Sequence, residues 1–120
     1  MRHHVIEMAG QELKCRLTTQ NIVALERKIG GRNILKVLMD DQIMSVDIVL
    51  LTLHASLQAI EHGYTMDKVY SLYDAYVESG KTYMDLLPEL ISVLEVSGFF
   101  TRPPQEEQKN PDQAENNITI

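Results

Sequence analysis

Six glycines constrain the fold of this chain more than any other feature, because each stands where one periodic segment gives way to the next. They are Gly10, Gly30, Gly31, Gly63, Gly80 and Gly98. A glycine just beyond a helix can adopt the left-handed conformation that ends it, so the last five predict helix ends. The chain of 120 residues is therefore predicted to be one small domain built mainly of short helices.

Residues 4–8 and 12–17 each alternate apolar and polar side chains, which is the period of a β-strand. The stretch Ala9-Gly10-Gln11 between them suits a tight turn, so the two segments predict an N-terminal antiparallel hairpin. An isolated hairpin is marginally stable, and its apolar face must therefore pack on the helices that follow.

After Leu17 the period changes to that of a helix, and Thr18 or Thr19 is expected to cap the first one. The predicted helices are 19–29, the short segment 32–39, the most apolar and therefore central segment 45–61, then 65–78 and 82–97. Pro88 predicts either a kink in the last helix or a start near Leu87, because proline inside a helix costs about 3 kcal/mol. The expected fold class is a small bundle of four to five helices with a minor β-hairpin.

Hydroxyl side chains stand where three of these helices are predicted to begin. Ser45, Thr65 and Thr82 can each accept a hydrogen bond from a free amide of the first helical turn. Thr82 and Asp85 have the spacing of a capping box, in which the carboxylate bonds back to the amide of the cap residue. These residues fix the expected starts of the helices.

The composition changes abruptly after Phe100. The stretch "TRPPQEEQKNPDQAENN" holds three of the four prolines and almost no apolar side chain. Such a segment buries too little surface to offset the entropy of ordering. We therefore predict a helical domain over residues 1–100 and a disordered, acidic, proline-rich tail over residues 101–120.

The charge of the chain argues against nucleic acid as a partner. A formal net charge of -6 repels a phosphate backbone, and no predicted helix face carries a dense cluster of Lys and Arg. The first twelve residues lack the apolar core of a signal peptide, and no apolar run reaches the roughly 18 residues of a membrane span. We expect a soluble, unsecreted protein that binds neither nucleic acid nor membranes.

No group of residues in the sequence points to catalysis, to a cofactor or to a metal. Cys15, the only cysteine, lies on the apolar side of a predicted strand, where a buried structural thiol is expected. His3 and His4 adjoin the first residue and are expected to be solvated rather than to bind a metal ion. His54 and His62 lie too far apart on one predicted helix to share a metal. We therefore predict that the protein is not an enzyme.

Four tyrosines and two phenylalanines supply the candidate partner-binding residues. They are Tyr70, Tyr73, Tyr76, Tyr83, Phe99 and Phe100. Three of the tyrosines recur at steps of three along the predicted helix 65–78. Tyrosine joins apolar area to a polar tip, which suits both the edge of a core and a protein interface, so both interpretations stay open. One phenylalanine can close the last helix while the other stays available to a partner.

Five stretches between Leu13 and Phe100 follow one another in an order and spacing typical of a known family. They are "LKCRLTTQNIVALERKIGG", "ILKVL", "DIVLLTLHASLQAIEHGYT", "VYSLYDAYVESG" and "YMDLLPELISVLEVSGFF". In these stretches the sequence resembles the small tail assembly chaperones of long-tailed bacteriophages, especially phages of Gram-positive bacteria. The resemblance implies no catalytic position.

The resemblance implies a protein that binds the tape-measure protein, with the tail tube protein as a further candidate partner. It would keep them soluble in the cytoplasm of the bacterial host and be absent from the mature virion. Many such chaperones are also made in a longer, frameshifted form, and Gln108-Lys109-Asn110 can be encoded with the slippery run A AAA AAC. Self-association into a homo-oligomer stays open.

Two other classes of function also stay open. One is a structural tail component or head-tail connector, which would remain in the phage particle. The other is an unrelated small helical protein-binding or regulatory domain, for example a DNA-binding repressor, although the basic recognition helix that a repressor needs is not evident.

Overall fold

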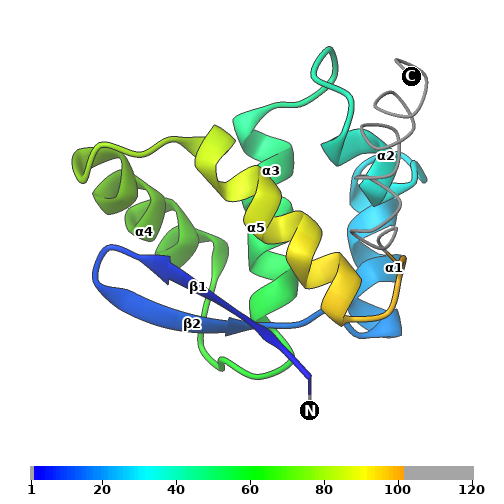
Figure 1. Cartoon of the computed structure of the whole chain (residues 1–120), viewed down its shortest axis with the longest axis horizontal. Coiled ribbons are helices and arrows are strands. Elements are labelled where there is room, and N and C mark those ends of the chain that lie inside the picture. Colours follow the sequence, from blue (N-terminus) through cyan, green and yellow to red (C-terminus); the bar gives the residue numbers. More distant parts are fainter. Residues whose placement is uncertain (1, 102–120) are drawn as a thin grey trace, which may run out of the picture.

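A computed structural model of the chain describes residues 2–101, and the hairpin forms where the alternation predicts it (Figure 1). Strands β1 (His4–Met8) and β2 (Gln11–Cys15) pair antiparallel, with Ile6 opposite Leu13. The second strand ends two residues earlier than predicted, because β1 begins at His4 and offers no partner beyond Cys15. The tail that we predict after Phe100, with its proposed frameshift site, lies outside the described residues apart from Thr101.

Five helices follow the hairpin. They are α1 (Thr19–Lys28), α2 (Ile34–Leu38), α3 (Val46–Leu57), α4 (Met66–Glu78) and α5 (Tyr83–Val96). The mainly helical fold class with an N-terminal hairpin is therefore confirmed.

The helices begin at the polar residues that the sequence indicates. Thr18 rather than Thr19 caps α1, and Ser45, Thr65 and Thr82 cap α3, α4 and α5. Both hydrogen bonds of the capping box between Thr82 and Asp85 are present. Pro88 lies inside α5, which already begins at Tyr83, so the alternative start near Leu87 is wrong.

Glycine ends three of the helices as predicted, and α5 shows how. Gly98 has a φ of 93°, and its amide donates to the carbonyl of Glu95 at 3.0 Å. The next amide, of Phe99, reaches back to the carbonyl of Leu94 at 3.0 Å. This pair of bonds is a Schellman motif, which satisfies carbonyls that the end of a helix leaves free.

The predicted end of the central helix is wrong. We expect it to reach residue 61, before Gly63, but α3 ends at Leu57. The side-chain amide of Gln58 donates to the carbonyl of His54 at 2.9 Å and to that of Tyr64 at 3.0 Å. The side chain of Gln58 therefore ends the helix several residues before Gly63. Residues 58–63 then turn towards α4.

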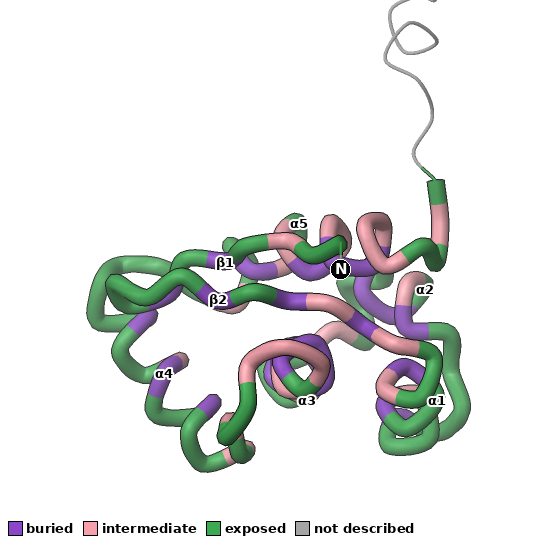
Figure 2. Tube along the Cα trace, turned by 90° about the horizontal axis from the view of Figure 1, so that it is seen from below, coloured by how far each residue is buried: buried purple, intermediate pink, exposed green. Residues whose placement is uncertain are grey.

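Helix α3 is the centre of the fold. Eight of its twelve residues are buried, and it contacts α1, α4, α5 and β2. Figure 2 shows α4, α3 and α1 side by side beneath the hairpin and α5. Its buried hydroxyls bond within the helix, from Thr52 to the carbonyl of Ile48 and from Ser56 to that of Leu53, both at 2.8 Å. No polar group of these two side chains is therefore left unpaired in the core.

The hairpin covers the core with one face. Ile6, Met8, Leu13 and Cys15 are at most 1% exposed, whereas the side chains between them face solvent. The alternation of buried and exposed residues along both strands can be followed in Figure 2. The apolar face of the hairpin thus packs on the helices, as its marginal stability in isolation requires.

The tight turn of the hairpin offers a test of the fold. Ala9 and Gly10 have φ values of 52° and 79°, as in a type I′ turn, and alanine is strained in this left-handed region. We expect Ala9→Asn to raise the free energy of unfolding by about 0.5–1 kcal/mol in urea titrations, because asparagine tolerates this conformation. Ala9→Val should lower it, and equal stabilities of the two variants would contradict the turn assignment.

Candidate protein-binding surface

The tyrosines do not form one surface. Tyr76 is 4% exposed in the core, Tyr73 is half-buried, and Tyr70 is 47% exposed. Three residues advance a helix by about 300°, so each step of three turns the side chain by about 60° and separates Tyr70 from Tyr76 by about 120°. The three tyrosines therefore lie in different environments, from solvent to core, and Tyr70 is the most exposed of them.

Tyr76 serves the core. Its ring lies 6.3 Å from that of Tyr73, centre to centre, in a tilted arrangement. Burial, together with the carboxylates of Asp85 and Glu89, raises the pKa of Tyr76 above its ordinary value. The phenol therefore stays neutral at physiological pH, and its contacts join α4 to the rest of the core.

Tyr73 connects α4 to the start of α5. Its hydroxyl oxygen accepts a hydrogen bond from the amide of Tyr83 at 2.8 Å. The other three amides at this helix start are also bonded: Thr82 donates to Asp85 Oδ2, Met84 to Thr82 Oγ1 and Asp85 to the carbonyl of Thr82. All four amides that a helix N-terminus leaves free are thus satisfied, and the first turn of α5 is held in place.

A groove beside this first turn is lined mainly by apolar side chains. Its volume is about 390 Å³, and its lining residues come from the end of α2, the α2–α3 loop and the start of α5. We call it the methionine groove; it is formed by Leu38, Met39, Asp41, Met44, Tyr83, Met84 and Leu87. Figure 1 shows the α2–α3 loop and the start of α5 at the same end of the molecule.

Two side chains of the methionine groove are widely open to solvent. Met39 is 68% exposed and Met84 is 53% exposed. Ile43 and Val46, which belong to the same loop and the start of α3, are 39% and 38% exposed. Contiguous apolar exposure of this kind on a small protein marks an interaction site more often than isolated apolar residues do.

Asp40 gives the α2–α3 loop its shape. Its carboxylate accepts a hydrogen bond from the amide of Gln42 at 3.0 Å, and its carbonyl accepts from the amides of Ile43 and Met44 at 3.3 and 3.1 Å. Because one residue holds three amides, the loop folds into a compact turn. The turn leaves Met39 and Ile43 exposed, whereas Met44 is half-buried and packs against the core.

The surroundings of the methionine groove are acidic. Residues 37–48 and 82–87 carry four carboxylates, Asp40, Asp41, Asp47 and Asp85, and no Lys, Arg or His. The basic residues next along the chain, Lys36 and Lys81, stand just outside these segments. Of these four, Asp41 lines the groove itself, whereas Asp85 lines another groove together with Lys81. The methionine groove therefore combines apolar walls with an acidic edge on the side of the α2–α3 loop.

The sequence does not single out this groove. Tyr83 is its only member among the six predicted partner-binding residues. Met84 lies far along the chain from Met39 and Met44. The contacts of α5 with α2 and α3 bring them together. One local signal was present: Met39, Ile43 and Met44 are apolar residues in a segment that also carries Asp40 and Asp41 and ends at a helix cap.

The two phenylalanines have different environments, and the binding of a partner by one of them stays a prediction. Phe100 is half-buried and packs against the core. The ring of Phe99 is 38% exposed and lines a shallow groove of about 260 Å³ beside Ile22, Ile34 and Leu94. Phe99 therefore provides a small apolar site that lies beside the start of α2, whereas the methionine groove lies at its end.

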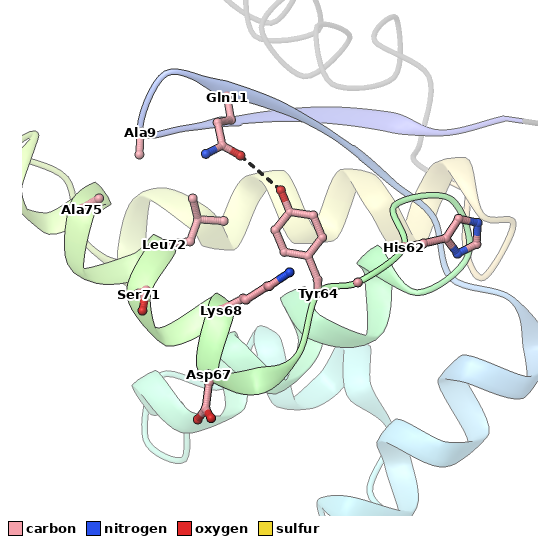
Figure 3. Close-up of a pocket in the computed structure, with 10 residues that line it drawn as sticks. Ala9, Gln11, His62, Tyr64, Asp67, Lys68, Ser71, Leu72 and Ala75 are labelled. Atoms are coloured by element: carbon pink, nitrogen blue, oxygen red, sulfur yellow. Dashed lines mark hydrogen bonds between the residues drawn. The ribbon is translucent and has the colours of Figure 1, made fainter.

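A larger groove between the hairpin turn and α4 is lined by both polar and apolar groups. Its volume is about 730 Å³, and Tyr64 closes one side by donating to the side-chain oxygen of Gln11 at 3.1 Å. Figure 3 shows Lys68 pointing towards Tyr64, Asp67 pointing away from the hairpin, and His62 at the far end. These titratable groups do not converge on one point, so the groove lacks the arrangement that acid-base catalysis needs.

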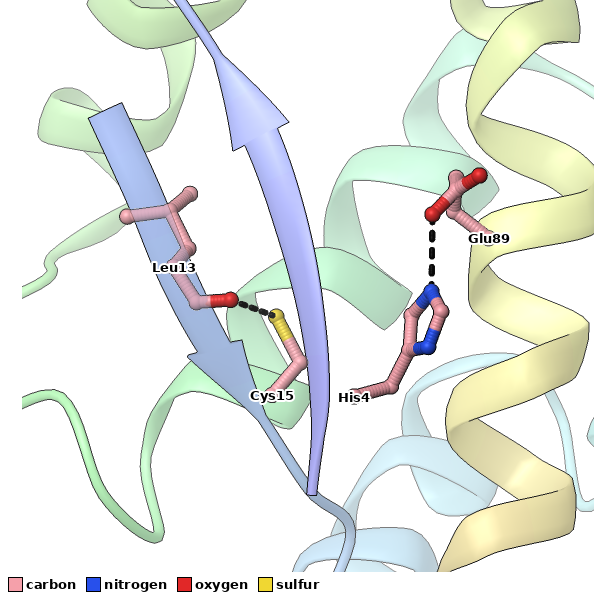
Figure 4. Close-up of polar contacts among 4 residues, drawn as sticks. All are labelled: His4, Leu13, Cys15 and Glu89. Carbon is pink, nitrogen blue, oxygen red and sulfur yellow. Dashed lines mark hydrogen bonds and ion pairs between the residues drawn. The ribbon is translucent and has the colours of Figure 1, made fainter. Parts of the chain in front are cut away.

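His4 and Cys15 are opposite one another in the hairpin but do not form a reactive pair (Figure 4). The thiol of Cys15 donates to the carbonyl of Leu13 at 3.7 Å, and burial raises its pKa to about 12. His4 Nε2 lies 2.7 Å from Glu89 Oε1 on α5. The expectation that His4 is solvated is therefore corrected: it is half-buried and pairs with α5.

Comparisons with known proteins place the chain in a family. The chain belongs to the DUF6096 family. Its description is "Family of unknown function (DUF6096)", and the match covers residues 2–119, from before β1 to within one residue of the C-terminus. Neither the curated proteins nor the solved structures include a match to the chain.

Residues 2–101 of this DUF6096 protein contain no three His, Cys, Asp or Glu side chains grouped so that they could hold a metal ion. None of the helices in that range combines the length and the apolar character needed to cross a membrane.

The hydrogen bond between Tyr73 and Tyr83 can be tested by stability. Tyr73→Phe leaves the first amide of α5 without its acceptor, and we expect the free energy of unfolding to fall by about 1 kcal/mol. Tyr70→Phe removes an equivalent hydroxyl from an exposed position and should leave stability unchanged. Urea titration measures both variants. Equal losses, or none in Tyr73→Phe, would show that this bond does not hold the start of α5.

Proposed function

We propose that this protein is a phage tail assembly chaperone that binds the tape-measure protein and keeps it soluble until the tail is built. Two observations support the proposal: the resemblance of five stretches between Leu13 and Phe100 to that family, and the methionine groove. The groove carries the proposal, because a chaperone of this kind acts by binding alone and needs an exposed apolar surface on a soluble body.

The chemistry of the groove suits temporary binding. Methionine is unbranched and polarizable, so Met39, Met44 and Met84 can adapt to apolar side chains of different shapes. The groove is small for a permanent interface, and binding through it would be reversible. An assembly factor needs this reversibility, since it must release its partner when the tail forms.

The acidic body of the protein suits the other half of the task. Proteins whose net charge is near zero tend to associate and precipitate. The net charge of -6 on this protein would help to keep a complex with an apolar partner in solution. We place the protein in the cytoplasm of the bacterial host and outside the mature virion. The tail tube protein is a further candidate partner, and no catalysis or cofactor is involved.

Co-expression with the tape-measure protein of the same phage tests the proposal. We expect the tape-measure protein to move from the insoluble to the soluble fraction and to be retained in a pull-down on this protein. Purified phage particles should lack the protein by mass spectrometry. If the tape-measure protein aggregates both with and without this protein, the proposal is contradicted. If this protein is found in finished particles, a structural tail component is favoured instead.

A matched pair of variants links the activity to the groove. Met39→Ser combined with Met84→Ser removes two exposed apolar side chains without adding charge, so the fold should remain intact while solubilisation is lost. Val77→Ser on α4 removes a side chain that is 45% exposed elsewhere and serves as the control. Circular dichroism and urea titration establish that both proteins are folded.

A further inference from the structure

We propose that the methionine groove receives an amphipathic α-helix of the partner protein whose apolar stripe is flanked by Lys and Arg. This inference rests on the proposed function and names the kind of segment that the groove recognises. It follows from three properties of the groove: its size, the state of its backbone amides and its charge.

The size of the groove suits a few side chains of a larger partner. A dry cavity of about 150 Å³ holds one benzene-sized group, so about 390 Å³ accommodates two or three apolar side chains. Residues at i, i+3 or i+4, and i+7 of a helix lie on one face. They span about 10 Å along its axis. A single helical stripe can therefore supply the side chains that fill the groove.

The backbone of the groove favours a helix over an extended strand. The amides of Met39, Asp40, Gln42, Ile43 and Met44 already bond within the loop and α2. The first four amides of α5 are bonded too, and no edge of the hairpin lines the groove. An extended peptide would find few amide donors there for its carbonyls, whereas a helix satisfies its own backbone.

The charge of the groove selects the flanks of the helix. Asp41 lines the groove, and Asp40 precedes it in the α2–α3 loop, so the loop side of the groove has an acidic rim. Asp40 uses one carboxylate oxygen to accept from the amide of Gln42, and its charge remains. Lysine or arginine beside the apolar stripe would meet this rim favourably, and aspartate or glutamate would be repelled.

The same charge argues against the two occupants that this chain itself could supply. A second copy that docked through the same face would bring its own Asp40 and Asp41 to the interface. The tail over residues 102–120 carries four acidic and two basic side chains with three prolines, so it offers neither the charge nor an uninterrupted helical stripe. A basic amphipathic helix of another protein is the complementary occupant.

Three synthetic peptides test this inference with the full-length protein. The first has about 18 residues, with leucine in a helical stripe and lysine on both sides. The second has the same composition in shuffled order, and the third has glutamate in place of lysine. Fluorescence anisotropy of labelled peptides should show binding of the first, with the other two weaker by about tenfold or more. Equal binding of the first two would overturn the inference.

Variants of the groove locate the binding. Met39→Ser with Met84→Ser should weaken the first peptide about tenfold, and Val77→Ser should have no effect. Asp41→Asn should reduce the preference for lysine over glutamate, because Asp41 lines the groove and its carboxylate accepts no hydrogen bond among the described contacts. Unchanged peptide binding in both groove variants would contradict the assignment.

The co-expression assay separates failure of this inference from failure of the proposed function. If the double methionine variant loses peptide binding but still solubilises the tape-measure protein, the groove is not the chaperone surface and the inference is overturned. If the unmodified protein binds the first peptide in the groove but not the tape-measure protein, the proposed function fails and the specificity of the groove stands.

Discussion

The burial of α3 is the constraint on which the rest of the structure depends. This helix is apolar on nearly all sides, and such a helix is stable in water only if neighbours cover it. The hairpin, α1, α4 and α5 provide that cover, and each contributes one apolar face to a common core. Since α2 and the start of α5 are fixed at one end of α3, the methionine groove is a consequence of this arrangement (Figure 1).

Local signals in the sequence predict the elements well where backbone chemistry decides them. Alternation locates the hairpin, hydroxyl caps locate three helix starts, and the glycines that end α1, α4 and α5 are correctly assigned. The end of α3 is missed because the side chain of Gln58 bonds to a carbonyl beyond the helix, at Tyr64, which is a tertiary contact. The short β2 is likewise decided by the strand opposite it.

The candidate site is less predictable than the fold, for a physical reason. A spacing of three residues suggests one shared face of a helix, but each step of three moves the side chain around the helix axis. Tyr70 and Tyr76 therefore lie in different environments. The methionines of the groove share no periodic pattern and meet only through the packing of α5 against α2 and α3. A surface assembled from a loop and a helix start becomes visible only in three dimensions.

Methyl NMR of the full-length protein with labelled methionines tests the central claim most directly. The chain has six methionines, three of them in the groove, while Met8 is 1% exposed in the core and Met66 lies on α4. On addition of the leucine-lysine helix, the account predicts shifts for Met39, Met44 and Met84, with Met8 and Met66 unchanged. Shifts centred on Met66, or none in the groove, would contradict it.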